Sequence, residues 1–339
     1  MPKEKPGASV PFPPMGAQHV AELPQPDGWQ YEPKWDGFRG VLENDGGELG
    51  LWSRNARPLL RYFPELAPLG ELMPPQSALD GEIVIEREGA LDFDAMQTRL
   101  HPAESRVRKL AAEIPARFIA FDVLLWDGKP VHERPLEERR AELERRAEGF
   151  TLSPATRDLA SAEQWLERLE AARLDGVVAK RLALPYLPGS RDGAVKFKRH
   201  RTADCVVAGV RWKKDGKIAT LLLGLYEDDG ELRYVGSAAV PAKNEAEIRA
   251  RVEPLLKDAP ERRFSEPSRW GTGELEEAAL RPELVVEIRF DKLERHRFRH
   301  GTRLLRFRDD KDPPQCTWRE VLPPLRKGDP TVDDLLASR

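Results

Sequence analysis

The chain has 339 residues and a formal net charge of −3, with 40% hydrophobic and 33% charged residues, which is typical of a globular protein with room for two domains. No apolar stretch approaches the length of a membrane span, and the first fifteen residues lack the apolar core of a secretory signal. Cys205 and Cys316 are the only cysteines, which fits a reducing cytosol and excludes a four-cysteine zinc site.

The first part of the chain predicts strands interrupted by helices, after a flexible lead-in at residues 1–15. Four apolar runs bounded by turn residues are typical of strands, namely 40–43, 49–52, 83–85 and 118–125. The first two flank the turn residues 44–47, which predicts a hairpin. Asp92 is expected to cap a helix that runs to Leu100, and residues 102–113 predict a second helix.

The middle of the chain continues this mixture. Residues 136–148 carry Glu and Arg at helical spacing, which predicts an exposed helix held by salt bridges. Residues 161–164 resemble a capping box ahead of Trp165, and strands are expected at 176–179 and 194–197. Because helices and hairpins mix without a regular strand–helix–strand alternation, the sequence predicts an α+β fold with antiparallel sheets.

The pattern changes after about Arg201, where short strands dominate. The strand-like runs are 205–212, 218–226, 232–235 and 284–290. One helix is expected at 244–257. Several short strands with one helix are typical of a small β-barrel of the OB type. We therefore expect a domain boundary between residues 199 and 204.

Two segments are strongly basic although the chain as a whole is slightly acidic. Residues 191–217 carry nine Lys or Arg against three Asp, and residues 289–311 carry nine against four acidic residues. Such an uneven distribution favours a face that binds a polyanion. A solvated, charged surface explains the same counts equally well.

The run from Glu32 to Arg39, Glu-Pro-Lys-Trp-Asp-Gly-Phe-Arg, contains the most informative residue, Lys34. Lysine is a poor nucleophile while protonated, and burial or neighbouring cations lower its pKa. On its own the run is compatible with a surface turn, but four later runs supply partners: 80–82, 121–122, 175–180 and 195–198. Strand alternation places Lys196 and Lys198 on one face, where a polyphosphate would relieve their repulsion. Together these runs indicate phosphoryl chemistry.

In this order the runs resemble the motifs of the covalent nucleotidyltransferase superfamily, and most closely those of the ATP-dependent DNA ligases. The similar segments are 34–39 (motif I), 53–55 (Ia), 79–85 (III), 118–124 (IIIa), 175–180 (IV), 194–198 (V) and 306–311 (VI). The likeness extends from about Met15 to Pro314. Residues 61–65 and 99–102 are similar to the small bacterial ligase C group, which is related to the ligase domain of ligase D.

The resemblance implies a nucleotidyltransferase (adenylation) domain followed by an OB-fold barrel. The expected parts are the lead-in at 1–15, the adenylation domain at 16–200, the OB-fold domain at 201–325 and a C-terminal tail at 326–339. ATP is implied as the AMP donor, Mg²⁺ or Mn²⁺ as the metal, and nicked double-stranded DNA as the substrate. A bacterial, cytoplasmic, nucleoid-associated monomer without membrane contact is also implied, with repair polymerases as partners.

The resemblance further implies a role for each site residue. Lys34 would attack the α-phosphorus of ATP to form a lysyl-AMP phosphoramidate, and the metal and the motif V lysines would lower its pKa. The remaining assignments are Glu32 and Phe121 at adenine, Arg39 and Glu82 at ribose, Lys196, Lys198 and Arg191 near the α-phosphate, Asp175 with Glu82 at the metal, Arg54 at the 5′-phosphate of the nick, and Arg308, Asp310 and Lys311 at the leaving pyrophosphate.

Three segments depart from the family pattern, and in one of them Gly236-Ser237-Ala238 stands where relatives often have Gly-Thr-Gly. Asp175 stands where motif IV usually has Glu, which is one methylene longer, and Ala56 stands where motif Ia often has Gly. The same fold would also suit an RNA ligase or an mRNA-capping guanylyltransferase, and a non-catalytic nick-binding module is a further alternative. An NAD-dependent ligase is disfavoured, because that family carries a four-cysteine zinc site.

Overall fold

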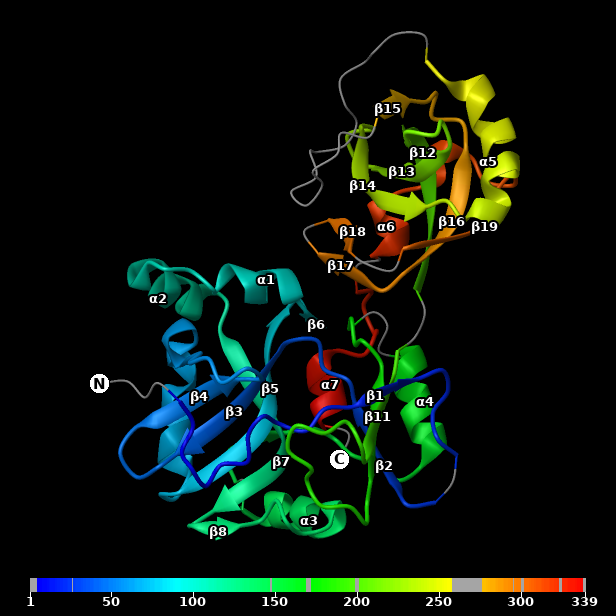
Figure 1. The fold of residues 1–339 in the computed structure, drawn as a ribbon. Helices are drawn as coiled ribbons and strands as arrows, with labels where there is room; N and C mark the ends of the chain where they lie inside the picture. Colours follow the sequence, from blue (N-terminus) through cyan, green and yellow to red (C-terminus); the bar gives the residue numbers. More distant parts are fainter. Residues whose placement is uncertain are drawn as a thin grey trace. The chain divides into compact units, whose positions relative to one another are not determined.

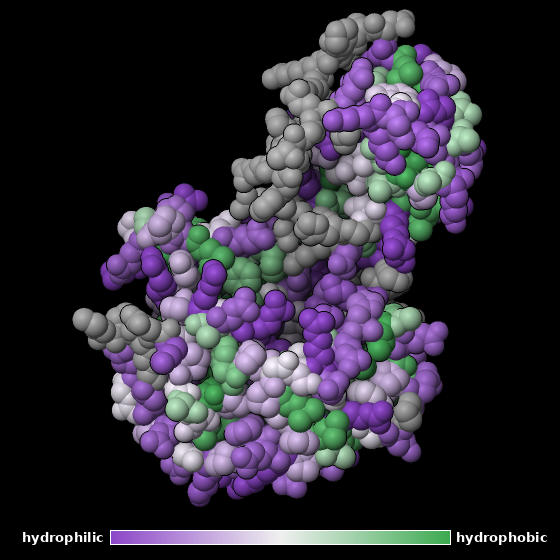
Figure 2. Space-filling model, in the orientation of Figure 1, coloured by the Kyte–Doolittle hydropathy of each residue, from purple (hydrophilic) through white to green (hydrophobic). Residues whose placement is uncertain are grey.

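The computed structural model describes residues 5–25, 27–146, 148–168, 172–198, 201–257, 276–294, 296–299, 302–322 and 325–337 (Figure 1). The chain divides into two compact units, one formed by Met1–Arg199 with Leu325–Arg339 and the other by His200–Pro324. Arg199 and His200, at the expected domain boundary, lie outside the described residues. Hydrophilic side chains cover most of the visible face of each unit, with small apolar patches between them (Figure 2).

The first unit contains two sheets. The larger has the strand order β4-β3-β5-β7-β8, with β6 paired to β5 and β9 to β7. Its strands are β3 (Phe38–Asn44), β4 (Leu49–Ser53), β5 (Ser77–Arg87), β6 (Ala90–Leu91), β7 (Ala116–Trp126), β8 (Lys129–Pro130) and β9 (Thr151–Leu152). The expected hairpin is confirmed, because β3 and β4 pair antiparallel around residues 44–47.

The smaller sheet has the order β1-β11-β10-β2 and carries the run that contains Lys34. Its strands are β1 (Gln18–Val20), β2 (Trp29–Pro33), β10 (Val177–Arg181) and β11 (Ala194–Phe197). Among the described strands of this unit, β1 pairs with β11 and β7 pairs with β9 in parallel, and the other pairings are antiparallel. The sheets are therefore mainly antiparallel, and the α+β prediction is confirmed.

The helices of the first unit lie close to the expected positions. They are α1 (Phe93–Thr98), α2 (Glu104–Glu113), α3 (Leu136–Arg146) and α4 (Leu159–Arg168), with 3-10 turns at Leu60–Tyr62 and Pro64–Leu72. Asp92 caps α1 as expected, since its side chain accepts a hydrogen bond from Ala95 N at 2.8 Å. The cap of α4 was placed wrongly: Asp158 accepts from Ser161 N at 2.9 Å, so Ser161 lies inside the helix.

Helix α3 is not the fully exposed helix that its charge pattern predicted. Its salt bridges exist, but Arg139 is only 1% exposed and donates to both carboxylate oxygens of Asp122 at 2.8 and 2.9 Å. Charge alternation does not distinguish a solvated face from a buried one when the partner carboxylate lies on another element. The two buried charges compensate each other, and loss of either would leave the other unpaired.

Both ends of the described chain pack on the first unit. Val10 and Met15 are buried and Gly7 N donates to Glu43 Oε1 at 2.8 Å, so residues 5–15 differ from the flexible lead-in that the sequence suggested. Helix α7 (Val332–Ala337) lies among the elements of this unit (Figure 1), and its residues Val332 and Leu335 are buried in one of the unit's apolar clusters. The cluster contains Trp35, Val84, Leu91, Ile119, Ala172, Leu174, Val332 and Leu335. The expected tail at 326–339 is therefore part of the first unit over its described residues.

The second unit is a closed barrel. Its sheet follows the order β13-β14-β19-β16-β12-β15, and an additional β12–β13 pairing closes the ring. The barrel strands are β12 (Arg201–Trp212), β13 (Ile218–Tyr226), β14 (Leu232–Ala239), β15 (Glu276–Ala279), β16 (Val285–Phe290) and β19 (Arg303–Phe307). This arrangement confirms the expected OB-type barrel.

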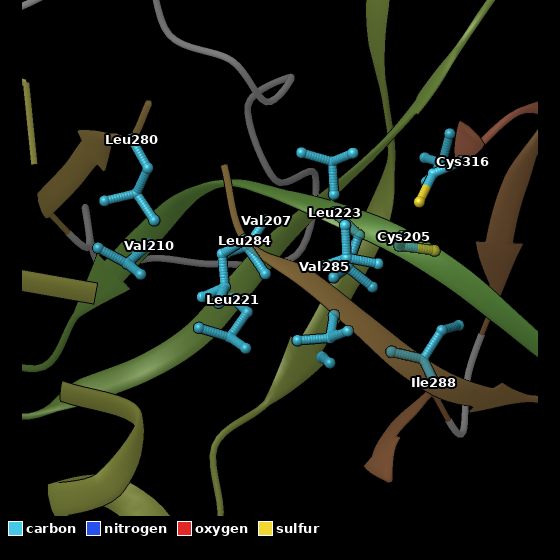
Figure 3. Packing of buried hydrophobic residues seen from close by; sticks show 14 of the residues in the cluster. Cys205, Val207, Val210, Leu221, Leu223, Leu280, Leu284, Val285, Ile288 and Cys316 are labelled. Carbon is cyan, nitrogen blue, oxygen red and sulfur yellow. The ribbon is translucent and has the colours of Figure 1, made fainter. Parts of the chain in front are cut away.

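The remaining elements of the second unit decorate this barrel. They are α5 (Glu245–Val252), the hairpin β17 (Lys292–Glu294) and β18 (Arg297–Arg299), α6 (Trp318–Val321), and 3-10 turns at Ala242–Asn244, Glu253–Leu255 and Pro313–Gln315. Aliphatic side chains of β12, β13, β14 and β16 meet in the barrel core together with both cysteines, and Figure 3 shows part of this cluster. Among the described residues, no helix of either unit is long and apolar enough to cross a membrane.

Candidate active site

A cavity of about 210 Å³ lies in the first unit and is lined by residues of both sheets. Seven of the predicted site residues line it: Glu32, Lys34, Arg39, Arg54, Glu82, Phe121 and Lys196. Residues 15–17, Lys180 and Tyr186 are among the other residues that line it. The structure thus brings together predicted site residues that are up to 164 positions apart, between Glu32 and Lys196.

The position of Lys34 is set by the β2–β10 ladder, which continues past the end of β2. Lys34 N donates to Gly176 O at 2.9 Å, and Asp175 N donates to Lys34 O at 3.2 Å. Gly176 has a φ of 147°, and a Cβ there would lie 2.0 Å from the carbonyl oxygen of Phe197. Only glycine fits this close approach, so the Asp-Gly pair fixes Asp175 beside Lys34.

Asp175 forms salt bridges with two lysines. Lys34 Nζ donates to Asp175 Oδ2, and Lys198 Nζ lies 3.2 Å from the same oxygen. Burial opposes the charged form of both Lys34 and Asp175, but their mutual attraction raises the pKa of Lys34 and lowers that of Asp175. The direction for Lys34 is opposite to the one expected from the sequence, because that expectation considered the metal and the neighbouring lysines and not this carboxylate.

The surroundings of Lys196 disfavour its charged form. Burial lowers its pKa, and the positive charges of Lys34, Lys198 and Arg191 lower it further. Lys196 lines the cavity, while Arg191 is exposed and lies near enough to influence it. Positive charges that disfavour one another in this way favour the binding of an anion, as the sequence suggested for Lys196 and Lys198.

A β-bulge directs Phe121 into the cavity. Asp80 pairs with Asp122 and Gly81 pairs with Ala120, so Phe121 has no partner on β5. An extra residue of this kind re-aims a side chain. The ring of Phe121 carries two cations, with Arg39 Cζ 4.6 Å and Lys180 Nζ 4.5 Å from its centroid. One wall of the cavity thus combines the apolar ring of Phe121 with the charged groups of Arg39 and Lys180.

Arg39 is held by a buried network that sequence reasoning did not find. Its Nε and Nη2 donate to the two oxygens of Asp80, and Nη2 also donates to Met15 O at 3.2 Å. Tyr186 donates to Asp80 at 2.6 Å and accepts from Met15 N at 2.9 Å. Tyr186 stands outside all the motifs, and no local signal in the sequence marks it as a partner of Asp80.

Glu32 reaches the cavity through Lys180. The side chain of Glu32 is buried, and its oxygens lie 2.8 and 2.9 Å from Lys180 Nζ, while Gln30 Nε2 donates to it at 2.8 Å. These contacts hold Lys180 over the ring of Phe121. Lys180 is the last residue of the motif IV segment 175–180, but no role was assigned to it from the sequence. Its position in that motif could have marked it as a site residue.

Glu82 lies opposite Arg39 in the β3–β5 ladder and faces the same cavity. Burial raises its pKa to about 7, against the opposing charges of Arg39 and Lys34. A carboxyl whose pKa is higher in the folded than in the unfolded chain stabilises the fold at low pH. Its contribution is present below about pH 4.5 and is lost as the pH rises to about 7.

Glu82→Gln is therefore expected to change how stability depends on pH. Between pH 4.5 and 7.5 the free energy of unfolding of the native protein should fall by roughly 1 to 3 kcal/mol more than that of the variant. The reason is that Glu82 ionises over this range and Gln cannot. Urea denaturation at a series of pH values measures this. Glu104→Gln, at an exposed position in α2, is the control, and an equal pH dependence of all three proteins would contradict the expectation.

The residues around Lys34 include carboxylates, which are the ligands that a divalent metal such as Mg²⁺ prefers. Asp175, Asp36 and Glu82 all act on Lys34 electrostatically, so three carboxylates lie near the candidate nucleophile. Across the described ranges, no group of three His, Cys, Asp or Glu side chains could hold a metal by itself. Mg²⁺ is commonly bound by one or two carboxylates with water and phosphate oxygens, so these residues fit such a cation when a nucleotide is present.

A second pocket of about 420 Å³ contains the motif Ia residues Ser53, Arg54 and Asn55. Arg39, Arg54 and Glu82 line both pockets, which makes the two adjacent. Arg54 is exposed, as a residue that binds an incoming phosphate should be. Ala56, at the end of this motif, has a φ of 56°, a backbone conformation that favours glycine.

Ala56→Gly is expected to stabilise the protein. The left-handed conformation costs a side-chain-bearing residue about 1 to 2 kcal/mol, and the flexibility of glycine in the unfolded chain offsets part of the gain, so we expect an increase of about 0.5 to 1 kcal/mol. Urea denaturation measures the difference. Ala112→Gly in the exposed part of α2 should lower stability by about 1 kcal/mol, and a matching loss at Ala56 would refute the expectation.

The predicted motif VI residues belong to the second unit. Arg308 and Lys311 lie just after β19 and pair with carboxylates of that unit. Each unit thus contributes its own set of predicted site residues, and the cavity described above belongs to the first unit alone.

Comparison with known proteins adds three findings. Residues 14–198 match the family described as "ATP dependent DNA ligase domain", and residues 214–311 match "ATP dependent DNA ligase C terminal region". The chain is 45% identical to "DNA ligase C2" of Mycolicibacterium smegmatis, over 92% of this chain and 94% of that protein. It is 43% identical to "DNA ligase C" of Mycobacterium tuberculosis, over 93% and 95%.

A solved structure supports the fold independently. The chain is similar to the structure described as "DNA binding with a minimal scaffold: Structure-function analysis of Lig E DNA ligases", with a TM-score of 0.51 and 18% identity. The match covers 86% of this chain and 99% of that one.

Proposed function

Since this chain belongs to the family of ATP-dependent DNA ligases, we infer that it joins a 3′-hydroxyl to a 5′-phosphate at nicks in duplex DNA, by way of an AMP adduct on Lys34. The observation that carries this proposal is the position of Lys34. It lies at the wall of the cavity, is paired with Asp175, and shares its surroundings with Lys196 and Lys198.

The first step would transfer AMP from ATP to Lys34. The ammonium of Lys34 first loses a proton to solvent. The resulting neutral Nζ forms a bond to the α-phosphorus, and the bond from this phosphorus to the bridging oxygen of the β-phosphate breaks. Pyrophosphate leaves, and the nitrogen loses a further proton to give the phosphoramidate. Asp175 orients the amine, and Lys196 and Lys198 stabilise charge on the phosphate oxygens, so positioning and electrostatics supply most of the rate.

The adenosine part would occupy the rest of the cavity. Phe121 offers a face for adenine, held by the bulge and by the cations on it. Glu82 and Arg39 lie side by side for the ribose hydroxyls, and Glu32 supports the base side through Lys180. Arg191 would assist at the phosphates from its exposed position.

Asp175, with Glu82, would hold Mg²⁺ or Mn²⁺. When bound, such a cation neutralises charge that develops on the phosphate oxygens. Asp175 keeps the carboxylate that the family pattern requires, on a side chain that is one methylene shorter.

The later steps would use the second pocket, and the motif VI residues of the second unit would act in the first step. Arg54 would bind the 5′-phosphate of the nick, which accepts AMP from Lys34, and the 3′-hydroxyl then displaces AMP to form the phosphodiester. Arg308, Asp310 and Lys311 would act in the first step, by orienting the leaving pyrophosphate. The basic character of residues 191–217 and 289–311 supports contact with the DNA backbone.

The setting of the enzyme is inferred from this chemistry. We propose a monomer in the bacterial cytoplasm that works at the nucleoid. A repair polymerase that fills a gap leaves the 3′-hydroxyl that this reaction consumes, so such polymerases are the expected partners.

Sealing assays on matched nicks test the proposed function. ATP with Mg²⁺ should seal a nicked DNA duplex, and NAD or GTP should not replace ATP. Labelling from GTP would instead select a capping guanylyltransferase, and faster sealing of nicked RNA than of nicked DNA would select an RNA ligase. Tight binding to the nick without ATP turnover would identify a non-catalytic module.

A further inference from the structure

Both cations assigned to the leaving pyrophosphate converge on one carboxylate of the second unit, that of Asp204. Arg308 Nη1 donates to its two oxygens at 3.0 and 2.8 Å. Lys311 Nζ donates to Asp204 Oδ2 at 3.0 Å. In the sequence, Asp204 is one of the acidic residues of a basic segment. The fold brings it to Arg308, which is 104 positions further along the chain, and to Lys311, which is 107 positions further along.

The same cations have outer partners of a different kind. Arg308 Nε and Nη2 donate to Asp310 at 2.8 and 2.9 Å, and Lys311 also donates to Glu320. The side chains of Asp310 and Glu320 are 67% and 48% exposed, against 13% for Asp204. Exposed ion pairs contribute little and exchange readily with other anions, whereas the partly buried pair is screened much less.

The barrel fixes the position of Asp204. It lies in β12 opposite Glu287 of β16, and the next residue, Cys205, is fully buried in the core. Asp310 instead follows β19 in a turn. The inner carboxylate is thus part of a rigid strand, and the outer ones lie on surface segments.

We propose that Asp204 is a positioning residue for nucleotidyl transfer: it holds Arg308 and Lys311 next to each other as one cationic surface that receives the pyrophosphate of ATP. The exposed Glu320 gives way to phosphate oxygens at Lys311, while Asp204 stays in place. This inference rests on the proposed function, in which these cations act on the leaving pyrophosphate of the first step. Without Asp204 the two cations repel each other and turn to solvent, so the geometry needed for transfer is lost.

The test separates the step that releases pyrophosphate from the step that does not. Asp204→Asn should slow formation of the AMP adduct from labelled ATP by about 10- to 100-fold. The same variant should seal a nick that already carries AMP on its 5′-phosphate within about 3-fold of the native rate. In the reverse reaction, the pyrophosphate concentration that half-discharges the adduct should rise by a similar 10- to 100-fold.

Asp229→Asn is the matched control, since Asp229 pairs with Arg233 on an exposed turn of the same unit. It should leave all three measurements unchanged. Asp204→Glu keeps the charge and should recover part of the lost rate, and it also serves if Asp204→Asn does not fold. Asp204 would be only a structural residue if two results were obtained together. Asp204→Asn would slow adduct formation and sealing of the adenylylated nick equally, and Asp204→Glu would show the pyrophosphate dependence of the native protein.

A further variant distinguishes failure of this inference from failure of the proposed function. Arg308→Ala removes the cation itself and should slow adduct formation at least as much as Asp204→Asn. If Arg308→Ala is slow and Asp204→Asn is not, the role of Asp204 is refuted and the proposed role of Arg308 stands. If neither variant slows adduct formation, the assignment of these cations to the pyrophosphate is refuted as well.

Discussion

Replacing Lys34 with alanine is expected to abolish the AMP adduct and to lower ATP-dependent sealing of nicked DNA by about 10⁴-fold or more. The reason is geometric. The backbone of Lys34 is fixed by Gly176 and Asp175, and its Nζ is held by the Asp175 carboxylate, so no other amine of the site can take its place without moving a strand. Incubation with α-labelled ATP followed by a denaturing gel measures the adduct directly.

Two companion measurements make this result specific. Lys109→Ala, at a 72% exposed position of α2, is the matched loss of a lysine and should form the adduct normally. Lys34→Ala should still seal a nick that already carries AMP, because that step needs no lysine nucleophile. A labelled adduct that persists in Lys34→Ala would show that the nucleophile lies elsewhere.

Asp175→Asn should slow adduct formation by roughly 10²- to 10³-fold. The amide removes the charge that pairs with Lys34 and Lys198, and it leaves three neighbouring ammonium groups without their common carboxylate. It also removes a carboxylate for the divalent cation. Asp175→Glu, which restores the residue usual in the family, should stay within about 10-fold of the native rate because the charge is kept.

The dependence of this rate on Mg²⁺ concentration separates the two roles of Asp175. If Asp175 binds the cation, Asp175→Asn should need more Mg²⁺ for half-maximal rate, and Asp175→Glu should not. A slow Asp175→Asn variant with native Mg²⁺ dependence would leave only the pairing with Lys34. A native rate in Asp175→Asn would refute both roles.

Much of the fold could be predicted because its signals are local. Turn residues 44–47 between two apolar runs predicted the β3–β4 hairpin, and Asp92 before an amphipathic run predicted the start of α1. The barrel was predicted from the spacing of its strands. The error at α3 has a physical cause: Arg139 is charged yet buried, and only the distant Asp122 makes that burial tolerable.

The site divides in the same way. Lys34, Glu82 and Lys196 were placed at the cavity from runs of a few residues, and they line it. Tyr186 was missed, because its link to Asp80 spans 106 positions and depends on how two sheets meet. Phe121 is an intermediate case: strand alternation alone fits a core residue, and the bulge that turns its ring into the cavity has no signature in the sequence.

Helix α7 has a consequence for the order in which the protein is made. A ribosome adds residues 325–337 only after the whole barrel has been synthesised, yet Val332 and Leu335 cover Trp35, the neighbour of Lys34. The apolar cluster of the first unit can therefore be completed only after the barrel residues have been synthesised. Translation that stops after the barrel would yield a chain in which every motif is present and the unit that carries Lys34 is still unfinished.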